Sequence, residues 1–268
     1  MPLAQTRAER QRQGALDTAK KMRLEIPFAK DIRRILKAIS DDFYNEYIRS
    51  GSVIDVNAYA DDLNAALKKN YRNIANKFKR NLRTDKSIDM ETKGVDENIE
   101  GSLKQYIDVH SVKQTGLILN TTNELLNKDL QDSIIALSES GQELTNEKVA
   151  DITWKKNSAR VAGRANTISE TETQNMAEQT KQTEADELAI AGAVVAGIAI
   201  VQSILKKRWN SVLNERTRFP HAVADGQVIN ITQPFMVNGQ LLMYPGDTSL
   251  GASAGNTVNC KCWITYEV

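Results

Sequence analysis

Apolar side chains recur at three- and four-residue steps through much of the sequence before residue 168, which is the period of an α-helix with one buried face. One stripe covers residues 32–47 and is followed by Gly51, a residue type that ends helices because it accepts a positive φ. Another stripe covers residues 59–82, and either Asp55 or Asn57 can cap its start. The pattern predicts long helices that pack through narrow apolar faces, on one another or on a partner.

Two more stripes, over residues 95–107 and 117–137, extend the helical pattern, and Thr145 begins a further helix that leads towards Ile168. Proline interrupts a helix because it lacks an N–H donor and its ring clashes with the preceding turn. The chain has 5 prolines, and none of them lies between residues 28 and 219. That interval can therefore form long, uninterrupted helices.

The C-terminal part has a different pattern, in which short alternating runs lie between glycine and proline turns. Asp225-Gly226 and Asn238-Gly239 each predict a two-residue β-hairpin turn, because both residue types tolerate a positive φ. Residues 245–247 (Pro-Gly-Asp) predict a further turn. Residues 260–268 alternate as a strand, with both cysteines on one face.

Together these patterns predict an α+β protein. We expect an elongated, mainly α-helical N-terminal half and a small antiparallel β-sheet domain at the C-terminus.

Composition narrows the class of protein. With 41% hydrophobic residues and 35 basic against 34 acidic side chains, the chain is neither disordered along its length nor a uniformly basic nucleic-acid binder. Its 2 cysteines exclude a disulfide scaffold and fit a reducing cytosol, or a particle assembled in one. The N-terminal residues include no apolar stretch of the kind that forms a secretory signal.

The near-zero net charge conceals blocks of opposite sign. Residues 1–39 and 68–86 are rich in Lys and Arg, whereas residues 121–151 and 170–187 are rich in Asp and Glu. The 68–86 block is either a helix face that contacts phosphates or a solvated face paired with acidic neighbours. We expect alternating blocks of this kind to form assembly surfaces rather than a uniform coat for DNA.

One apolar run, residues 188–205, needs its own interpretation. Residues 188–201 have no polar side chain, but the run remains shorter than the roughly 20 residues that span a bilayer core. It is either a helix or strand buried in a core or subunit interface, or a membrane-active segment used in a delivery step.

The C-terminal part also has an ordered set of motifs, which reads W…ERTR…H…DGQ…F…PGD…NCxC. Its members are Trp209, residues 215–218, His221, residues 225–227, Phe235, residues 245–247 and residues 259–262. In order and spacing, this set resembles the phage Mu F-like head morphogenesis family, whose members are minor head proteins of tailed phages. The chain departs from the family pattern at Asn214 and Glu170, where the family usually has Asp and Arg.

The resemblance covers residues 115–268 and implies a division of the chain. It predicts a helical N-terminal region over residues 1–110 and a Mu F-like head morphogenesis domain over residues 111–268. Within that domain, we expect helices to about residue 205 and β-hairpins over residues 206–268.

The resemblance also implies a function. It predicts a non-enzymatic, structural minor head protein, located in the virion inside the head near the portal and in the host cytoplasm during assembly. Such a protein acts in head assembly, in genome delivery, or in both, with several copies at each portal vertex. The implied partners are the portal protein, packaged DNA, and the major capsid or scaffolding protein. The basic segments 1–39 and 68–86 are the candidate surfaces for DNA or for an acidic portal surface.

Candidate chemistry centres on Cys260, Cys262 and His221, because thiolate sulfur and imidazole nitrogen are preferred ligands of zinc, and Asp225 could complete a tetrahedral set. Two other interpretations stay open: the thiols pack as small hydrophobic groups, or the four residues form the nucleophilic site of a hydrolase or transferase. A disulfide between strand positions i and i+2 is awkward, because their Cα atoms lie roughly 6.5–7 Å apart. The other histidine, His110, is expected to be structural.

Three further charged residues have two interpretations. Arg216 and Arg218 alternate along a predicted strand, so they either form buried ion pairs with Glu172 or contact DNA phosphates.

Overall fold

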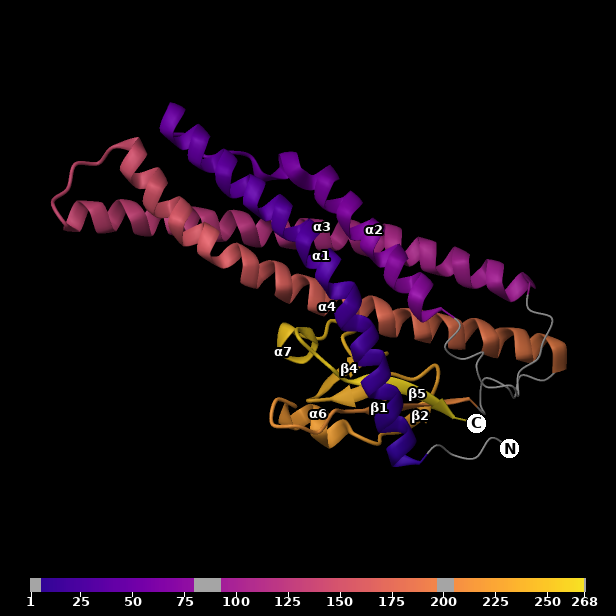
Figure 1. Ribbon diagram of the computed structural model, residues 1–268. Coiled ribbons are helices and arrows are strands. Elements are labelled where there is room, and N and C mark those ends of the chain that lie inside the picture. Colours follow the sequence, from indigo (N-terminus) through magenta and orange to yellow (C-terminus); the bar gives the residue numbers. More distant parts are fainter. Residues whose placement is uncertain (1–5, 80–92, 197–204, 268) are drawn as a thin grey trace. The chain divides into compact units, whose positions relative to one another are not determined.

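A computed structural model describes residues 6–79, 93–196 and 205–267 (Figure 1). Its helices are, in chain order, α1 (Arg7–Ser50), the short 3₁₀ helix η1 (Val56–Tyr59), α2 (Ala60–Phe78), α3 (Lys93–Glu139), α4 (Asn146–Ala196), α6 (Phe219–Ala224) and α7 (Ala254–Thr257). Its strands are β1 (Lys206–Asn210), β2 (Val228–Asn230), β3 (Phe235–Val237), β4 (Gln240–Leu242) and β5 (Trp263–Glu267). The predicted α+β class, with a helical N-terminal half and a small antiparallel sheet at the C-terminus, is confirmed.

The predicted helices form, and several are longer than their apolar stripes. The stripes over residues 95–107 and 117–137 belong to one continuous helix, α3. The helix α4 continues past Ile168 to Ala196, and α1 begins well before its stripe and includes Pro27. The end of the stripe over residues 59–82 lies outside the described residues, from residue 80 onward.

The helix ends follow the expected capping residues. Gly51, directly after α1, has a φ of 70°, and its N–H donates to the Tyr47 carbonyl at 2.9 Å. The Asp55 side chain accepts from the N–H of Asn57, but the element that it caps is η1, and α2 begins only at Ala60. Local chemistry therefore determines these ends as predicted, with one additional turn of 3₁₀ helix.

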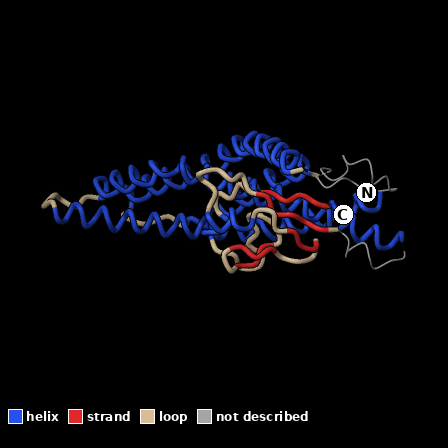
Figure 2. The backbone as a smooth tube through the Cα atoms, turned by 90° about the horizontal axis from the view of Figure 1, so that it is seen from below, coloured by secondary structure: helices blue, strands red, loops and turns tan. Residues whose placement is uncertain are grey.

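Three strands form an antiparallel sheet in the order β2-β1-β5, and Trp209 of β1 lies opposite Ile264 of β5. Figure 2 shows the strands in red. The strands β3 and β4 form a separate hairpin around Asn238-Gly239. Both turn residues have a positive φ, 52° for Asn238 and 72° for Gly239, as a two-residue hairpin requires. This predicted hairpin is confirmed.

The hairpin predicted at Asp225-Gly226 is wrong. Residues 219–224 form the helix α6, and the N–H of Gln227 donates to the carbonyl of Ala224 at 3.0 Å. With φ −56° and ψ 127° at Asp225 and a φ of 84° at Gly226, the four residues 224–227 form a type II turn that leads from α6 into β2. Proline in the first turn favours a helix, and Pro220 lies there.

The strand predicted at Arg216 and Arg218 is also wrong. The N–H of Thr217 donates to the carbonyl of Asn214 at 2.9 Å, which closes a turn, and Arg218 is the N-cap residue of α6. The two arginines therefore do not alternate along a strand face.

The chain divides into two compact units that do not follow the sequence order. The sheet unit combines the described parts of Met1–Leu24, Tyr71–Tyr106 and Glu170–Val268, and the helical unit combines Glu25–Asn70 and Ile107–Ser169. The helices α1, α2, α3 and α4 each contribute residues to both units. The expected boundary at residue 110 falls inside α3, so no linker separates the two regions there.

The helical unit has a core of apolar stripes, as the periodicity predicts. Its buried apolar side chains include Ile32, Leu36, Ile39, Phe43, Leu63, Leu67, Leu119, Leu126, Val149 and Val161. On its surface, two lysines of the 68–86 block form ion pairs of 2.8 Å, Lys68 with Asp108 and Lys69 with Asp31. These pairs match the interpretation of that block as a solvated face with acidic neighbours.

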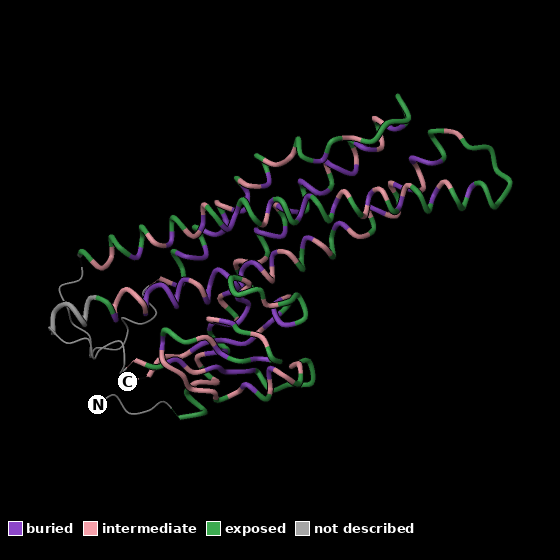
Figure 3. The backbone as a smooth tube through the Cα atoms, turned by 180° about the vertical axis from the view of Figure 1, so that it is seen from behind, coloured by how far each residue is buried: buried purple, intermediate pink, exposed green. Residues whose placement is uncertain are grey.

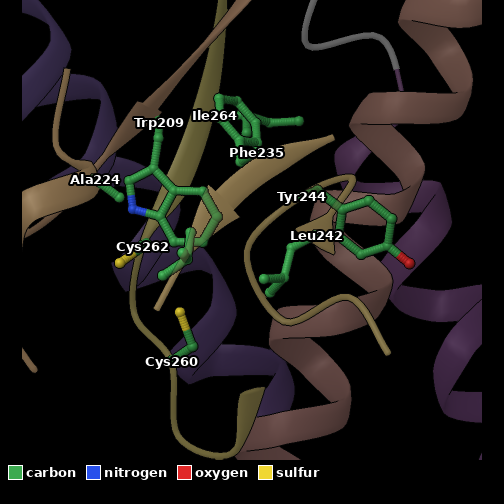
Figure 4. Close-up of a cluster of buried hydrophobic side chains, with 9 residues drawn as sticks. Trp209, Ala224, Phe235, Leu242, Tyr244, Cys260, Cys262 and Ile264 are labelled. Atoms are coloured by element: carbon green, nitrogen blue, oxygen red, sulfur yellow. The ribbon is translucent and has the colours of Figure 1, made fainter. Parts of the chain in front are cut away.

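The sheet unit has an interior that is partly polar. Its apolar cluster gathers around Trp209 and Phe235 and includes both cysteines (Figure 4). Beside this cluster lies the second half of α4, where every residue of 172–185 except Gln179 is buried, as the burial along the chain in Figure 3 illustrates. The acidic block over residues 170–187 was expected at an assembly surface, and this expectation is wrong for its buried residues.

Side chains of α4 cover the outer edge of the sheet at β5. The Gln174 amide donates to the carbonyl of Cys262 at 2.7 Å, and the Glu178 carboxylate accepts from the N–H of Ile264 at 3.0 Å. An additional strand would otherwise form hydrogen bonds with these two backbone groups. Because α4 already binds them, this edge of the sheet is not open for pairing with another chain. This cover positions the segment that carries the two cysteines.

Candidate functional site

The candidate site joins a short helix to the segment before the last strand. His221 lies in the first turn of α6, and Cys260 and Cys262 lie between α7 and β5. Asn259 has a φ of 55°, so the chain turns directly before Cys260. The guanidinium of Arg218 donates to the carbonyl of Val258 at 2.5 Å, which ties the start of α6 to the cysteine segment.

The three side chains meet in the interior of the sheet unit. His221 Nδ1 lies 3.5 Å from Cys260 Sγ and 3.4 Å from Cys262 Sγ, and the three atoms lie within 4.8 Å of one another. His221 and Cys260 are each 2% exposed, and Cys262 is 3% exposed. Figure 4 shows the two cysteines below Trp209 in the apolar cluster. The site is therefore a closed group of two sulfurs and one imidazole nitrogen.

Trp209 of β1 and Ser211, just after that strand, hold the histidine in place. The Ser211 hydroxyl donates to the backbone carbonyl of His221 at 2.7 Å and lies 3.3 Å from Cys262 Sγ. The Trp209 indole N–H donates to that hydroxyl at 3.2 Å, and the Trp209 ring meets the His221 ring edge to face at 5.7 Å. The other ring nitrogen, His221 Nε2, is buried without a hydrogen-bond partner among the described residues.

The two thiols titrate as a linked pair. The pKa of Cys260 is lowered to about 5, because the Cys262 thiol and then the His221 ring hydrogen-bond to its thiolate and outweigh the effect of burial. The pKa of Cys262 is raised well above its usual value, first because its proton is held by the Cys260 thiolate and second because the group is buried. Because the two sulfurs share these contacts, loss of a proton from one thiol opposes its loss from the other.

The sequence-based interpretation of Asp225 differs from its place in the structure. Its carboxylate accepts from the backbone N–H of Ser211 at 2.7 Å, so it caps the end of β1. It is not part of the group that His221 forms with the two cysteines. A Cys–His–Asp nucleophilic arrangement is therefore not assembled in this structure.

The remaining candidate residues lie elsewhere. His110 is buried within α3, in the helical unit. Glu172 accepts a hydrogen bond of 2.5 Å from the Tyr71 hydroxyl, Arg218 binds the Val258 carbonyl, and Arg216 is exposed.

Two groups of residues have no signal in the sequence that would have identified them. Ser211 supports His221, although no spacing rule links them. The buried charged groups of the sheet unit are a second example: Lys21 Nζ lies 2.6 Å from Glu178, and Lys181 Nζ lies 2.6 Å from Asp17 and 2.9 Å from Glu178. A helical period in the apolar residues is the pattern by which sequence predicts buried positions. A helix that is covered on all sides has no such period, so these charged residues could not be identified as buried.

The apolar run over residues 188–205 is partly described. Its first residues belong to α4, and residues 197–204 lie outside the described residues. In the part of the chain that the structure covers, no helix is both long and apolar enough to cross a membrane.

Comparison with known proteins gives one relationship. Over 91 residues, the chain is 28% identical to minor head protein GP7 of Bacillus phage SPP1. The match covers 33% of this chain and only 29% of the phage protein. No protein-family model and no solved structure matches the chain. The similarity supports a relationship to a phage head protein.

Proposed function

We propose that the chain is a non-enzymatic, structural minor head protein of a tailed bacteriophage. It acts inside the head beside the portal, in head assembly, genome delivery or both. The observation that carries this proposal is the similarity over 91 residues to a phage minor head protein. The ordered motifs of the C-terminal part, which resemble the Mu F-like head morphogenesis family, support the same class.

The burial of the motif residues supports a structural role. Trp209, His221, Cys260 and Cys262 are all interior residues of the sheet unit, so the motif describes how this unit folds. An enzyme that used these side chains would need them open to substrate and linked to a base. Instead, they are closed off, and Asp225 binds a backbone N–H.

We propose the portal protein as the first partner, with packaged DNA and the major capsid or scaffolding protein as further partners. Phe219 and Val223 on α6 are 81% and 69% exposed, which offers an apolar contact surface on the sheet unit. The basic residues Lys68 and Lys69 form ion pairs with carboxylates of the same chain. Because these pairs compete with binding to DNA phosphates, they favour a protein over DNA as the main partner.

The location is tested in particles of the phage that encodes the chain. Quantitative mass spectrometry of purified virions, with the portal protein as internal standard, is expected to find several copies for each portal. Virions made without the protein are expected to show altered heads or poor genome delivery. Failure to detect the protein in purified wild-type virions would contradict the proposal.

The contact surface is tested with Phe219→Ser, and Leu250→Ser is the matched control, since Leu250 is another exposed apolar residue of the sheet unit. We expect Phe219→Ser to lower incorporation into virions severalfold while Leu250→Ser leaves it unchanged. Incorporation of the Phe219→Ser variant at the wild-type level would contradict this contact surface.

A further inference from the structure

We propose that His221, Cys260 and Cys262 bind one zinc ion that closes the fold of the sheet unit. This inference does not depend on the proposed role in the phage head.

The ligand types select the metal. Two thiolates and an imidazole form a soft to borderline donor set, which suits zinc and disfavours magnesium and calcium, since these ions require oxygen ligands. Cysteine and histidine together are the common ligands of structural zinc sites in proteins.

The separations match a tetrahedral ion. Bonds of about 2.3 Å to sulfur and about 2.05 Å to nitrogen, at a tetrahedral angle, place sulfur and nitrogen about 3.6 Å apart. The measured separations from His221 Nδ1 are 3.5 Å to Cys260 Sγ and 3.4 Å to Cys262 Sγ. Both sulfur–nitrogen separations therefore match a tetrahedral site, and all three ligand atoms lie within 4.8 Å of one another.

The charges also balance. Two thiolates neutralise the charge of a divalent cation, and a neutral imidazole adds no charge, so the complete site is neutral. A neutral complex avoids most of the desolvation cost of an ion buried in an interior where the ligands are 2–3% exposed. A tetrahedral ion needs a fourth ligand, and the candidate is the Ser211 hydroxyl, which lies 3.3 Å from Cys262 Sγ.

The place in the fold gives the ion a structural task. His221 comes from α6, and the cysteines come from the segment before β5, 39 and 41 residues later in the chain. An ion between them would close a long loop around β2, β3 and β4. Closing loops of this length stabilises a small unit by restricting the unfolded chain.

Metal binding is tested directly on the full-length protein, purified under reducing conditions and stripped with a chelator. Addition of Co²⁺ is expected to produce the thiolate-to-cobalt charge-transfer band and the visible bands of a tetrahedral site. Both should saturate at one equivalent per chain and disappear when Zn²⁺ displaces the cobalt. A folded wild-type protein that shows neither band would overturn the proposal.

Substitutions assign the ligands. Cys262→Ser and His221→Gln are each expected to weaken zinc binding by at least about a hundredfold, measured in competition with a chromophoric chelator. His110→Gln is the matched control, since the chain has 2 histidines and His110 lies in the helical unit, and it should bind zinc as the wild type does. Equal zinc affinity in all variants would overturn the assignment.

A measurement on the wild type keeps the proposal testable if the variants fail to fold. With zinc bound, both thiols should react with a thiol reagent at least about tenfold more slowly than after a chelator is added, while the far-ultraviolet circular dichroism still shows the helices. Burial alone would protect the thiols equally with and without the chelator, and that result would refute a bound ion.

Discussion

The two halves of α4 belong to one continuous helix, but they are buried in different ways. In the first half, within the helical unit, the buried residues follow a stripe at four-residue steps, with Thr153, Asn157, Val161 and Ala165 on it, and solvent covers the opposite face. In the second half, within the sheet unit, nearly all of residues 172–185 are buried, although most of them are polar or charged.

The difference lies in what surrounds each half. Around the second half, partners approach from several elements: Asp17 and Lys21 of α1, Tyr71 of α2, Tyr106 of α3, and the backbone of the cysteine segment. A helix surrounded in this way has no solvent face, so its polar side chains must find partners within the protein. Hydrogen bonds and ion pairs, rather than an apolar stripe, therefore determine how this half is packed.

The largest expected effect comes from Glu178. Its buried carboxylate binds Lys21 at 2.6 Å, Lys181 at 2.9 Å and the N–H of Ile264 at 3.0 Å. Glu178→Ala leaves buried lysines with too little opposite charge, so we expect it to lower the free energy of unfolding by about 3–5 kcal/mol. Urea denaturation followed by circular dichroism measures the loss.

The matched control for Glu178 is on the first half of the same helix. Asp151 forms an ion pair of 2.6 Å with Lys155, one turn away and open to solvent. Asp151→Asn is expected to cost less than about 0.5 kcal/mol. Equal losses in the free energy of unfolding for the two variants would show that the buried ion pairs of the sheet unit contribute no more than an exposed one.

A smaller effect is expected from pH, through Lys207 in the sheet unit. Burial lowers the pKa of Lys207 to about 8, against the opposing attraction of Asp186 and Asp247. Asp186 in turn has its pKa raised to about 6, chiefly by burial, so it stays ionised above that pH. Between about pH 8 and 10.5 the unfolded chain therefore holds more protons at this lysine than the folded chain does, and stability rises with pH.

This rise is measured by urea denaturation at pH 7.5 and 9.5. We expect the wild type to gain roughly 2 kcal/mol relative to Lys207→Met over this interval, at up to about 1.4 kcal/mol per pH unit within the window. Lys155→Met, on the exposed face of the first half of α4, should retain the wild-type rise. A Lys207→Met variant that gains as much stability as the wild type would contradict the role assigned to Lys207.

The last expected effects are at two helical glycines. A Cβ added at Gly14 would overlap the ring of Trp263, whereas one added at Gly163 would meet nothing within 4 Å. Gly14→Ala should therefore cost about 1–3 kcal/mol through overpacking. Gly163→Ala should stabilise by up to about 1 kcal/mol, because alanine is the better helix former. Thermal unfolding of both variants tests this, and stabilisation by Gly14→Ala would refute the close contact.

Much of the fold could be predicted from local pattern. The stripes locate the helices of the helical unit because apolar burial there follows the helical period. The hairpin at Asn238-Gly239 follows from two residues that accept a positive φ. The same reasoning failed at Asp225-Gly226, because a positive φ at Gly226 fits both a hairpin and the type II turn that ends α6.

The candidate site was predictable only in part. The predicted strand over residues 260–268 begins only at Trp263, so the cysteines precede β5 rather than lie in it. Both sulfurs nevertheless lie beside His221, the neighbour that the motif suggested. The roles of Ser211 and Asp225 could not be predicted, because they depend on where the end of β1 lies relative to α6.

Sequence patterns alone were enough to predict the class of the fold, the end of α1 at Gly51 and one hairpin, since each depends on the conformational preference of neighbouring residues. The tertiary structure alone decided that a polar stretch of α4 becomes the interior of the sheet unit. It also decided that His221 meets two cysteines from 39 and 41 residues further along the chain. These contacts join residues far apart in sequence through hydrogen bonds and shared burial, and such interactions leave no periodic pattern by which they could be predicted.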